Sequence, residues 1–498
     1  LFFGLILLTC ALGSNVRAQI NEGVLLGTQP VASGSRAFGM GGNLISAADG
    51  VDALDFNPAA LAPLASREFT ISGFNRDNHS VANYLGLSNN SQFDAGALSS
   101  VGIASPYPVL QGHLAFGVSF DRLRDYTSQY SFNAVNPNQN LFNTQEFLGA
   151  GTASSGTGYR NRDFLGNNNL AYALGLTYDV PDSGAFALDA PSFAGMQESG
   201  NVTTEGGLDA VRIGGAIDIA PTISLGLTAN ILFGTYDYLQ NYTVTNVHSI
   251  ATDTGTAAPA GFENATVATH LHQDQSGGSL KLGLLANEEV FRIGATIESP
   301  QVLHINETSD LTGVALFSGA PNPYSSDQMD FPPLYAQTYD IVEPWKFGLG
   351  GSVHLLGLTG TASVTYLNMS DLQFTNTTFD MSDLNNYAAD SLRPVLSWQL
   401  GAEYKFPIIG LALRAGYSFE PSPYVGDPSN YGISAISVGA GIPLGKYCDL
   451  DAAWRHSSYH TLHTLYDDTT PSGTQVSGIV TDDAVSRDDI MLTLTFKY

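Results

Sequence analysis

Three histidines near the end of the chain come closest, by type and spacing, to a metal site. His456, His460 and His463 fall within one stretch of eight residues, and zinc is commonly held by histidine together with cysteine or carboxylate ligands. No cysteine or closely spaced carboxylate completes the set. We therefore interpret the three as a solvated, unliganded cluster at the end of a strand and its loop, and we expect no metal.

Motifs for catalysis are also missing from the sequence. Asp49, Asp52 and Asp55 do not follow the D-x-D-x-D-G spacing of a calcium loop. The sequence contains no G-x-S-x-G nucleophile elbow, no phosphate-binding P-loop and no G-x-G-x-x-G dinucleotide motif. We expect no catalytic residue, no cofactor and no enzymatic activity. Binding without a chemical step is the class of function that remains.

The composition excludes nucleic acid as a partner and favours strands. The chain of 498 residues has 46 acidic against 19 basic residues and a formal charge of -27, which repels a phosphate backbone. Only 13% of the residues are charged, whereas 53 Gly, 23 Tyr and 26 Phe are high numbers for this length. This profile is typical of a protein rich in strands and aromatic residues.

The first residues of the sequence have the character of a targeting segment. Residues 1–12 are almost entirely apolar, and Val16-Arg17-Ala18 offers small residues ahead of a cleavage point, so we expect a signal peptide over 1–18 that is truncated at its N-terminus. A lipoprotein signal at Cys10 is the alternative, but a threonine before the cysteine fits it poorly. Beyond residue 18 no apolar run reaches the roughly 20 residues of a membrane-spanning helix, and Cys448 is left without a disulfide partner.

Alternation of apolar and polar residues is the dominant pattern after residue 67. In 490–498 every second side chain is apolar or aromatic, and those between them include two threonines and a lysine. The stretches 345–355, 398–406 and 410–419 repeat the pattern. Successive side chains of a strand face opposite sides, so one face of each strand suits lipid and the other suits water. A soluble β-sandwich alternates in the same way, and the connections must decide between the two.

Connections between the expected strands are alternately very short and long, which is typical of the periplasmic turns and outer loops of outer-membrane barrels. The expected strands are 67–75, 94–105, 112–122, 208–219, 222–238, 276–286, 290–304, 340–355, 357–370, 395–406, 409–420, 431–443, 447–459 and 488–498. The long outer loops are expected at about 123–207, 239–275, 305–339, 371–394 and 460–487. We predict an all-β fold: a transmembrane antiparallel β-barrel of about 14 strands over 67–498.

The segment 19–66 differs from the barrel that follows it. It lacks strand alternation, is rich in glycine between Gly34 and Gly42, and ends in FNPAALAPL just before the first expected strand. Its length suits a plug inside a barrel of this size. We therefore predict an N-terminal hatch that lies within the barrel.

Residues 35–64 (SRAFGMGGNLISAADGVDALDFNPAALAPL) resemble the hatch of the FadL/TodX family of outer-membrane transporters of hydrophobic compounds. The stretches PWKFGLGGSVHLLGLTGTASVTYLN, LGAEYKFPIIGLALRAGYSFEPSP and SVGAGIPLGKYCDLDAAWRHS resemble that family's C-terminal strand pairs, whereas the loops 123–207 and 239–275 match only loosely. The resemblance implies a plugged 14-stranded barrel that holds its ligand in apolar pockets. It also implies sideways release through a wall opened by a kink near the third strand, for which Gly117 is a weak candidate.

Four residues of the hatch carry the resemblance most closely. Asn57, Pro58 and Ala59 match the family's hatch motif residue for residue. Asparagine can satisfy backbone groups locally and proline fixes φ, so a purely structural turn is the simpler interpretation. Arg36 would meet either a carboxylate of the wall, which we favour because a buried charge needs a fixed partner, or the carboxylate of a ligand.

Apolar residues of the hatch and of the longest loop are the candidates for ligand contact. The hatch candidates for an apolar pocket are Phe38, Met40, Leu54 and Phe56. The candidates for capture at the outer loop are Phe132, Phe142, Phe147 and Phe164. Packing of the hatch, or of the loop on itself, explains both sets as well.

We expect a bacterial outer-membrane channel for hydrophobic small molecules, with long-chain fatty acids as the first choice of ligand. Capture by loops, binding in an apolar pocket and release gated by the hatch would need no chemical step. A PorV-like barrel that serves protein secretion as a shuttle is the alternative, because such barrels also carry a Gly-rich segment with Asn-Pro-Ala, and an open porin is a third reading that the expected plug disfavours. Outer-membrane lipid, and the barrel assembly machinery through the C-terminal aromatic strand, are the other expected partners of a monomer.

Overall fold

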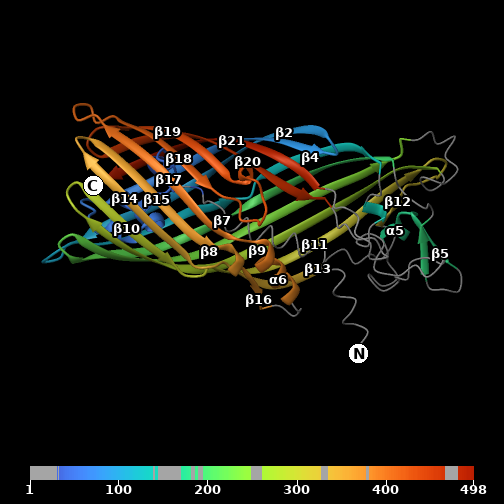
Figure 1. Ribbon diagram of the computed structural model, residues 1–498, viewed down its shortest axis with the longest axis horizontal. Coiled ribbons are helices and arrows are strands. Elements are labelled where there is room, and N and C mark those ends of the chain that lie inside the picture. Colours follow the sequence, from blue (N-terminus) through green and yellow to red (C-terminus); the bar gives the residue numbers. More distant parts are fainter. Residues whose placement is uncertain are drawn as a thin grey trace.

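The computed structural model is a closed barrel whose strands cross the molecule obliquely (Figure 1). It describes residues 31, 33–137, 141–143, 170–180, 185–188, 195–247, 261–326, 335–376, 381–465 and 480–498. The signal peptide expected over 1–18 lies outside the described residues.

Fourteen antiparallel strands form the wall, and each pairs with the next along the chain. Pairing of the last strand with the first, from Glu68↔Lys497 to Asn83↔Asp482, closes the ring. The wall strands are β1 (Glu68–Tyr84), β2 (Leu87–Tyr107), β3 (Leu114–Asp125), β7 (Met196–Ala220), β8 (Ile223–Thr245), β9 (Phe262–Asn287), β10 (Phe291–Glu298), β14 (Lys346–Leu355), β15 (Leu358–Asn368), β17 (Pro394–Lys405), β18 (Ala412–Glu420), β19 (Ile433–Pro443), β20 (Cys448–Thr464) and β21 (Val480–Lys497). The predicted fold class and strand number are confirmed.

Shorter elements extend the wall outward or lie within the barrel and its loops. The additional strands are β4 (Ser128–Asn136), β5 (Thr177–Val180), β6 (Ala185–Leu188), β11 (Val302–Phe317), β12 (Tyr324–Ser325), β13 (Tyr335–Val342) and β16 (Gln373–Thr375). The helical elements are α2 (Ser35–Gly39), η1 (Gly50–Asp52), α3 (Ala53–Phe56), η2 (Pro58–Leu61), η3 (Leu141–Asn143), α5 (Leu170–Ala173), η5 (Met369–Asp371), α6 (Ser382–Ser391) and η6 (Ser429–Tyr431).

Several strands are longer than the alternation predicted, so the outer loops are shorter than expected. The expected connection 76–93 is instead the outer part of β1 and β2, which meet at the two-residue turn Leu85-Gly86 with φ values of 49° and 84°. Strands also occupy parts of the expected loops 123–207, 239–275 and 305–339. Outward side chains in these extensions are often polar, so the apolar alternation that marks the membrane-facing part of a strand fades there.

Two strands that the sequence predicted as continuous are interrupted by proline. The expected strand 290–304 divides into β10 and β11 around Pro300, and 340–355 divides into β13 and β14 around Pro344. Proline has no N–H to give to the ladder, which explains both interruptions.

The outward face of the wall is a continuous apolar belt. On β8 and β9 the paired residues Leu227 and Leu282 are 47% and 46% exposed, and Phe347 and Leu349 on β14 continue the belt. Burying such a belt in hydrocarbon rather than water is strongly favourable. None of the described helices is long and apolar enough to cross a membrane.

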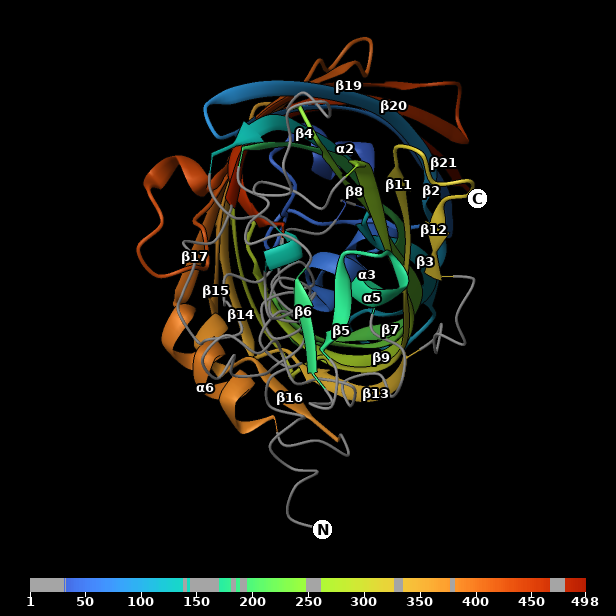
Figure 2. The ribbon, with the colours of Figure 1, turned by 90° about the vertical axis from the view of Figure 1, so that its right-hand side faces the viewer.

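The N-terminal segment 33–66 lies inside the barrel, where Figure 2 shows α2 and α3 within the ring of strands. Its apolar residues pack against small or apolar inward residues of the wall, among them Ala115, Ala216 and Met491. We refer to 33–66 as the hatch.

Two further apolar clusters fill the lumen on the extracellular side of the hatch. The middle cluster includes Leu208, Leu232, Leu303, Ile305, Ile341, Leu367, Met369 and Val395. The outer cluster includes Tyr84, Phe132, Phe142, Met196, Val202, Tyr242 and Phe262. Along β7 the order is Val202 in the outer cluster, Leu208 in the middle cluster and Ala216 against the hatch. The three clusters therefore follow one another along the lumen, and aromatic residues such as Tyr84, Phe132 and Tyr242 are most frequent in the outer one.

Candidate functional site

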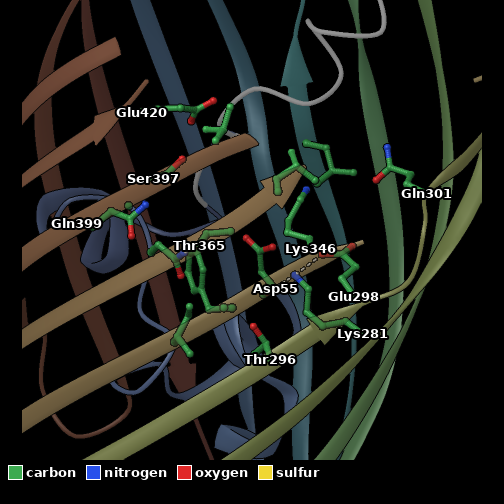
Figure 3. A pocket seen from close by; sticks show the side chains of 18 of the residues that line it. Asp55, Lys281, Thr296, Glu298, Gln301, Lys346, Thr365, Ser397, Gln399 and Glu420 are labelled. Atoms are coloured by element: carbon green, nitrogen blue, oxygen red, sulfur yellow. Dashed lines mark hydrogen bonds and ion pairs between the residues drawn. The ribbon is translucent and has the colours of Figure 1, made fainter. Parts of the chain in front are cut away.

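A cavity of about 140 Å³ lies in the lumen between the hatch and the middle cluster (Figure 3). Inward side chains of the wall form most of the remaining lining beside the hatch residues, which are Gly41, Gly42, Asn43, Ile45, Asp55 and Phe56. Because the hatch closes one side and the middle cluster the other, a ligand here would be surrounded by protein. This is the best candidate for a binding site.

One side of the cavity is apolar. Leu208, Leu367, Met369 and Val395 belong to the middle cluster and line the cavity as well. Phe56 adds an aromatic ring from the hatch. This side can take an apolar chain out of water, which favours binding in proportion to the area buried.

The other side of the cavity is polar and charged. Lys281 Nζ lies 3.2 Å from Glu298 and donates to the backbone oxygen of Asp55 at 2.6 Å. Asn230 also donates to Glu298, at 3.2 Å. Lys346 lies near the same carboxylate, but no carboxylate among the described residues forms an ion pair with it. The cavity can therefore offer an ammonium group to the polar end of a ligand.

Buried ion pairs fix the hatch to the wall below the cavity. Arg212 of β7 lies 2.8 Å from Asp55 of the hatch and 2.7 Å from Asp121 of β3, and all three side chains are at most 7% exposed. A buried charge without its partner is strongly unfavourable. These contacts hold α3 in one position against the wall.

Arg36 joins the hatch to the opposite part of the wall. Its guanidinium lies 3.1 Å from Glu403 of β17 and 3.0 Å from Asp49, and it donates to the backbone oxygen of Ala47 at 2.9 Å. Burial disfavours its charge, but Asp49 and Glu403 together hold the pKa of Arg36 above its usual value. Of the two partners considered for Arg36, the structure contains the wall carboxylate.

Asn57 and Pro58 form the turn between α3 and η2. The Asn57 side chain accepts from the N–H of Ala59 at 3.1 Å and donates to the backbone oxygens of Ile45 and Leu284 at 2.9 and 3.1 Å. Pro58 takes the first position of η2, where its missing N–H costs nothing. The motif thus ties two parts of the hatch to β9.

A ring of inward glycines, which we call the glycine collar, surrounds the hatch. In each of them a Cβ atom would lie against the hatch, and at Gly416 it would collide with the backbone nitrogen of Gly41. The collar consists of Gly102, Gly117, Gly214, Gly226, Gly283, Gly294, Gly348, Gly350, Gly401, Gly416 and Gly439, on ten of the wall strands. Hatch atoms lie close to the wall at these positions, backbone at Gly416 and side chain at Gly348, so the hatch and the collar are in tight contact. Gly117 serves this contact, against Leu54, and β3 does not break at it.

The four apolar hatch candidates occupy different places. Phe56 lines the cavity. Phe38 packs under the guanidinium of Arg455, 5.5 Å from the ring centre, and Met40 and Leu54 are fully buried against the glycine collar. We therefore predict direct contact with a ligand for Phe56 before the other three.

The loop candidates are less accessible than a capture role requires. Phe132 lies on β4 and Phe142 in η3, and both are buried in the outer cluster, at 1% and 0% exposure. They pack the interior of the outer wall, which is the alternative that the sequence left open. Phe147 and Phe164 lie outside the described residues.

The three histidines of the C-terminal strand pair lie on β20 and contact aspartates of β21. His456 and His460 lie 3.0 and 3.2 Å from Asp488 and Asp482. Among the described residues no group of three or more possible ligands is arranged to hold a metal ion.

Sequence reasoning missed the polar side of the cavity and the glycine collar. Charged residues are rare in membrane-spanning strands, and an isolated charge at an inward position therefore indicates a functional site. The charges that could have been found in this way are Lys281, Glu298 and Lys346. The collar could be found only by knowing which glycines share one height in the barrel.

Comparisons with known proteins give the fold. No family model matches the sequence, and no curated protein sequence matches it. Among solved structures, a FadL homologue of Pseudomonas aeruginosa is 14% identical with a TM-score of 0.57, over 94% of this chain and 99% of that one. The toluene transporter TodX of P. putida is 12% identical with a TM-score of 0.52, over the same shares.

The chain has the FadL/TodX barrel fold. This fold and the apolar belt place the protein in the bacterial outer membrane. The resemblance of residues 35–64 to the FadL/TodX hatch agrees with the fold. The sequence identity to the solved structures is too low for their substrates to be assigned to this chain.

Proposed function

We propose that this protein is a channel that takes hydrophobic compounds across the outer membrane. The observation that carries the proposal is the cavity between the hatch and the middle cluster, with an apolar side at Leu208 and Val395 and a polar side at Lys281. The solved structures of this fold include a transporter of toluene, which supports a channel for apolar molecules. A porin would need an open aqueous lumen, whereas the hatch occupies part of this one.

Long-chain fatty acids are the ligands we propose first. The tail would extend from Phe56 into the middle cluster, where its desolvation favours binding. The carboxylate would lie beside Lys346, which among the described residues has no ion-paired carboxylate. A bare hydrocarbon would leave the polar side of the cavity unsatisfied, and unpaired buried polar groups weaken binding.

The proposed role of the hatch is to close the inner end of the lumen. Its ion pairs at Arg212 and Arg36 and its contact with the glycine collar support a firmly seated plug. A ligand held above it would be kept from periplasmic water until it leaves the cavity.

Mass spectrometry of organic extracts from the purified, folded barrel tests the proposal. We expect a retained long-chain acid, and we expect Phe56→Asp and Lys346→Met each to reduce its amount, because they remove the apolar and the cationic contact respectively. Phe69→Leu on the outside of the barrel, far from the lining, serves as the matched control. Extracts without any lipid, together with a secreted protein that co-purifies, would count against the channel and for a secretion shuttle.

A further inference from the structure

Five polar side chains meet where the hatch contacts strands β14, β15 and β17. They are Ser46 of the hatch, Ser352 of β14, Thr361 and Ser363 of β15, and Gln399 of β17. Each of these residues is at most 7% exposed. In each, a buried side-chain oxygen has no hydrogen-bond partner among the described residues. We call the five residues the polar track.

The wall residues of the polar track are neighbours in the sheet. Ser352 is paired with Thr361 across β14 and β15, and Ser363 is paired with Gln399 across β15 and β17. Thr361 and Ser363 are two residues apart on β15, so their side chains lie on the same face of the strand. Because all four residues are buried, this face is the one toward the lumen. The four side chains thus form a polar strip on the inside of the wall.

The hatch meets this strip at Gly350 of β14. A Cβ atom there would lie 3.0 Å from Ser363 Oγ and 3.2 Å from the backbone nitrogen of Ser46, so polar atoms of the wall and of the hatch approach the same glycine. Buried hydroxyl groups are costly unless they are hydrogen bonded. Water can donate to such groups and accept from them, and buried water commonly does so. The polar track therefore has the chemistry of a site for bound water.

The polar track lies between two cavities. Gln399 lines the cavity above the hatch (Figure 3). Glu403, four residues farther along β17, lines a second cavity of about 200 Å³ that includes Gly410 of the turn between β17 and β18. Charged side chains such as Arg36 and Lys497 also line this second cavity, so it suits water. Four strand residues span about 13 Å, and the polar track covers this distance.

Other contacts of the hatch suit water less well. Toward β7 and β8 the hatch presents Leu54 and Pro58 to glycines of the collar. Toward β1 and β21 the hydroxyls of Ser35 and Ser72 each lie 2.8 Å from the hydroxyl of Thr493, so these groups satisfy one another. The polar track is therefore the side of the hatch where water has the most to bind.

A ligand that enters the cavity above the hatch has to displace the water inside it. This cavity has room for several water molecules. The lumen on its extracellular side is occupied by the apolar side chains of the middle and outer clusters, and the ligand itself would come along that path. Water that leaves needs hydrogen-bonding groups on its way. The polar track supplies them.

We infer that the polar track is a water drain, through which the cavity above the hatch exchanges water with the second cavity as a ligand enters or leaves. The drain rests on the proposed function, since it needs a ligand that fills the cavity. The ligand itself does not take this path, because Met40 and Ile45 of the hatch press against the collar at Gly401 and Gly350.

Binding kinetics of cis-parinaric acid, a fatty acid that fluoresces when it leaves water, test the drain in the purified barrel. Thr361→Val with Ser363→Ala removes two hydroxyls of the track without adding bulk. We expect the association and dissociation rate constants in stopped-flow experiments to fall together by roughly tenfold, with Kd unchanged, because water has to leave before binding and return after release. Unaltered rates, or a weaker Kd with an unaltered association rate, would overturn the drain.

Thr228→Val is the matched control. Thr228 is fully buried on β8, and its hydroxyl also lacks a partner among the described residues. It approaches Leu54 of the hatch at Gly214, away from the polar track. We expect both rate constants to stay as in the parent barrel. Equal slowing in this control would contradict the drain, because any buried hydroxyl beside the hatch would then have the same effect.

Radiolytic footprinting measures the exchange of water without a ligand. X-rays convert bound water into hydroxyl radicals that oxidise neighbouring side chains, and rapid mixing with water labelled with oxygen-18 gives the exchange rate. Met369 lines the cavity, whereas Met491 is fully buried in the hatch cluster, outside both cavity linings. We expect the label to appear at Met369 roughly tenfold more slowly in Thr361→Val with Ser363→Ala than in the parent, with Met491 unlabelled in both.

The two measurements separate failure of the drain from failure of the proposed function. Equal exchange at Met369 in the parent and in the double variant would overturn the drain, whatever the barrel binds. A parent barrel that binds neither parinaric acid nor palmitic acid, yet shows the difference in exchange at Met369, would refute the proposed function while supporting the path for water.

Discussion

The two halves of the lumen are built from opposite kinds of residue. Below the cavity, the hatch meets a collar of glycines and is pinned by buried ion pairs such as Arg212 with Asp55. Above the cavity, the middle and outer clusters consist of large aliphatic and aromatic side chains, with Tyr339 and Phe374 fully buried. The wall of the inner half carries glycine where the hatch touches it, whereas the wall of the outer half carries large side chains.

This difference indicates what each half can do. Backbone packed on backbone, with charges in fixed pairs, tolerates almost no displacement. Large apolar side chains can change rotamer and still exclude water, so that half can admit a molecule of similar polarity. We interpret the inner half as a rigid seal and the outer half as a deformable path.

The largest expected effect is in the rigid half. Arg212→Met leaves Asp55 and Asp121 buried without their cation, so we expect a loss of about 3–5 kcal/mol in the free energy of unfolding. Guanidinium unfolding in detergent, followed by circular dichroism, measures it. Arg487→Met, where the guanidinium contacts the ring and hydroxyl of Tyr459, is the control and should cost far less. Equal losses of stability in the two variants would contradict the distinction between the two halves of the lumen.

The second largest effect is expected from a single valine in the glycine collar. Gly416→Val forces a side chain into the backbone of Gly41, and overpacking of this kind costs about 1–3 kcal/mol. Because the hatch has to move, ion conductance through the barrel in planar bilayers should rise. Gly360→Val, at a strand glycine with open space around it, should change neither quantity. If Gly416→Val changed neither the free energy of unfolding nor the conductance, the hatch would be loosely held.

The deformable half should respond differently to a lost side chain. Leu208→Ala removes a buried residue of the middle cluster that also lines the cavity, and we expect a cost of about 2 kcal/mol, near the low end for such changes, because neighbouring side chains can relax into the space. Hydrogen exchange of the hatch amides should stay as in the parent protein. Faster exchange in the hatch would show that the two halves are coupled.

The smallest expected effect is a pH dependence of the hatch. Partial burial of Asp52, reinforced by the charges of Asp49, Asp121 and Asp55, raises its pKa from 3.8 to about 8. Because the pKa is raised, the protonated carboxyl of Asp52 stabilises the seated hatch. This stabilisation is complete below about pH 4 and is lost as the pH rises toward about 8. Hatch amides should therefore be better protected at low pH than at high pH, after correction for intrinsic exchange. Asp52→Asn should flatten the profile, and an unchanged slope would exclude Asp52 as its cause.

Alternation along the sequence was enough to predict the barrel. In 490–498 each residue's polarity reports the side that it faces, because a strand repeats every two residues and lipid accepts only apolar side chains. The even strand number followed from the same local pattern, whereas the hatch predicted over 19–66 was set apart by its lack of alternation and stays a prediction in those bounds. The outer extensions of β1 and β2 were missed because their outward residues no longer face lipid.

Only the tertiary structure decided where the barrel could bind and how the hatch is held in it. Lys281 and Lys346 are 65 residues apart in the sequence and come to one cavity because β9, β10 and β14 are neighbours. The opposition of Pro300 and Pro344, and the common height of the collar glycines, likewise depend on strand register. A sequence states the polarity of each residue locally, whereas register joins residues distant along the chain and is fixed only when the barrel closes.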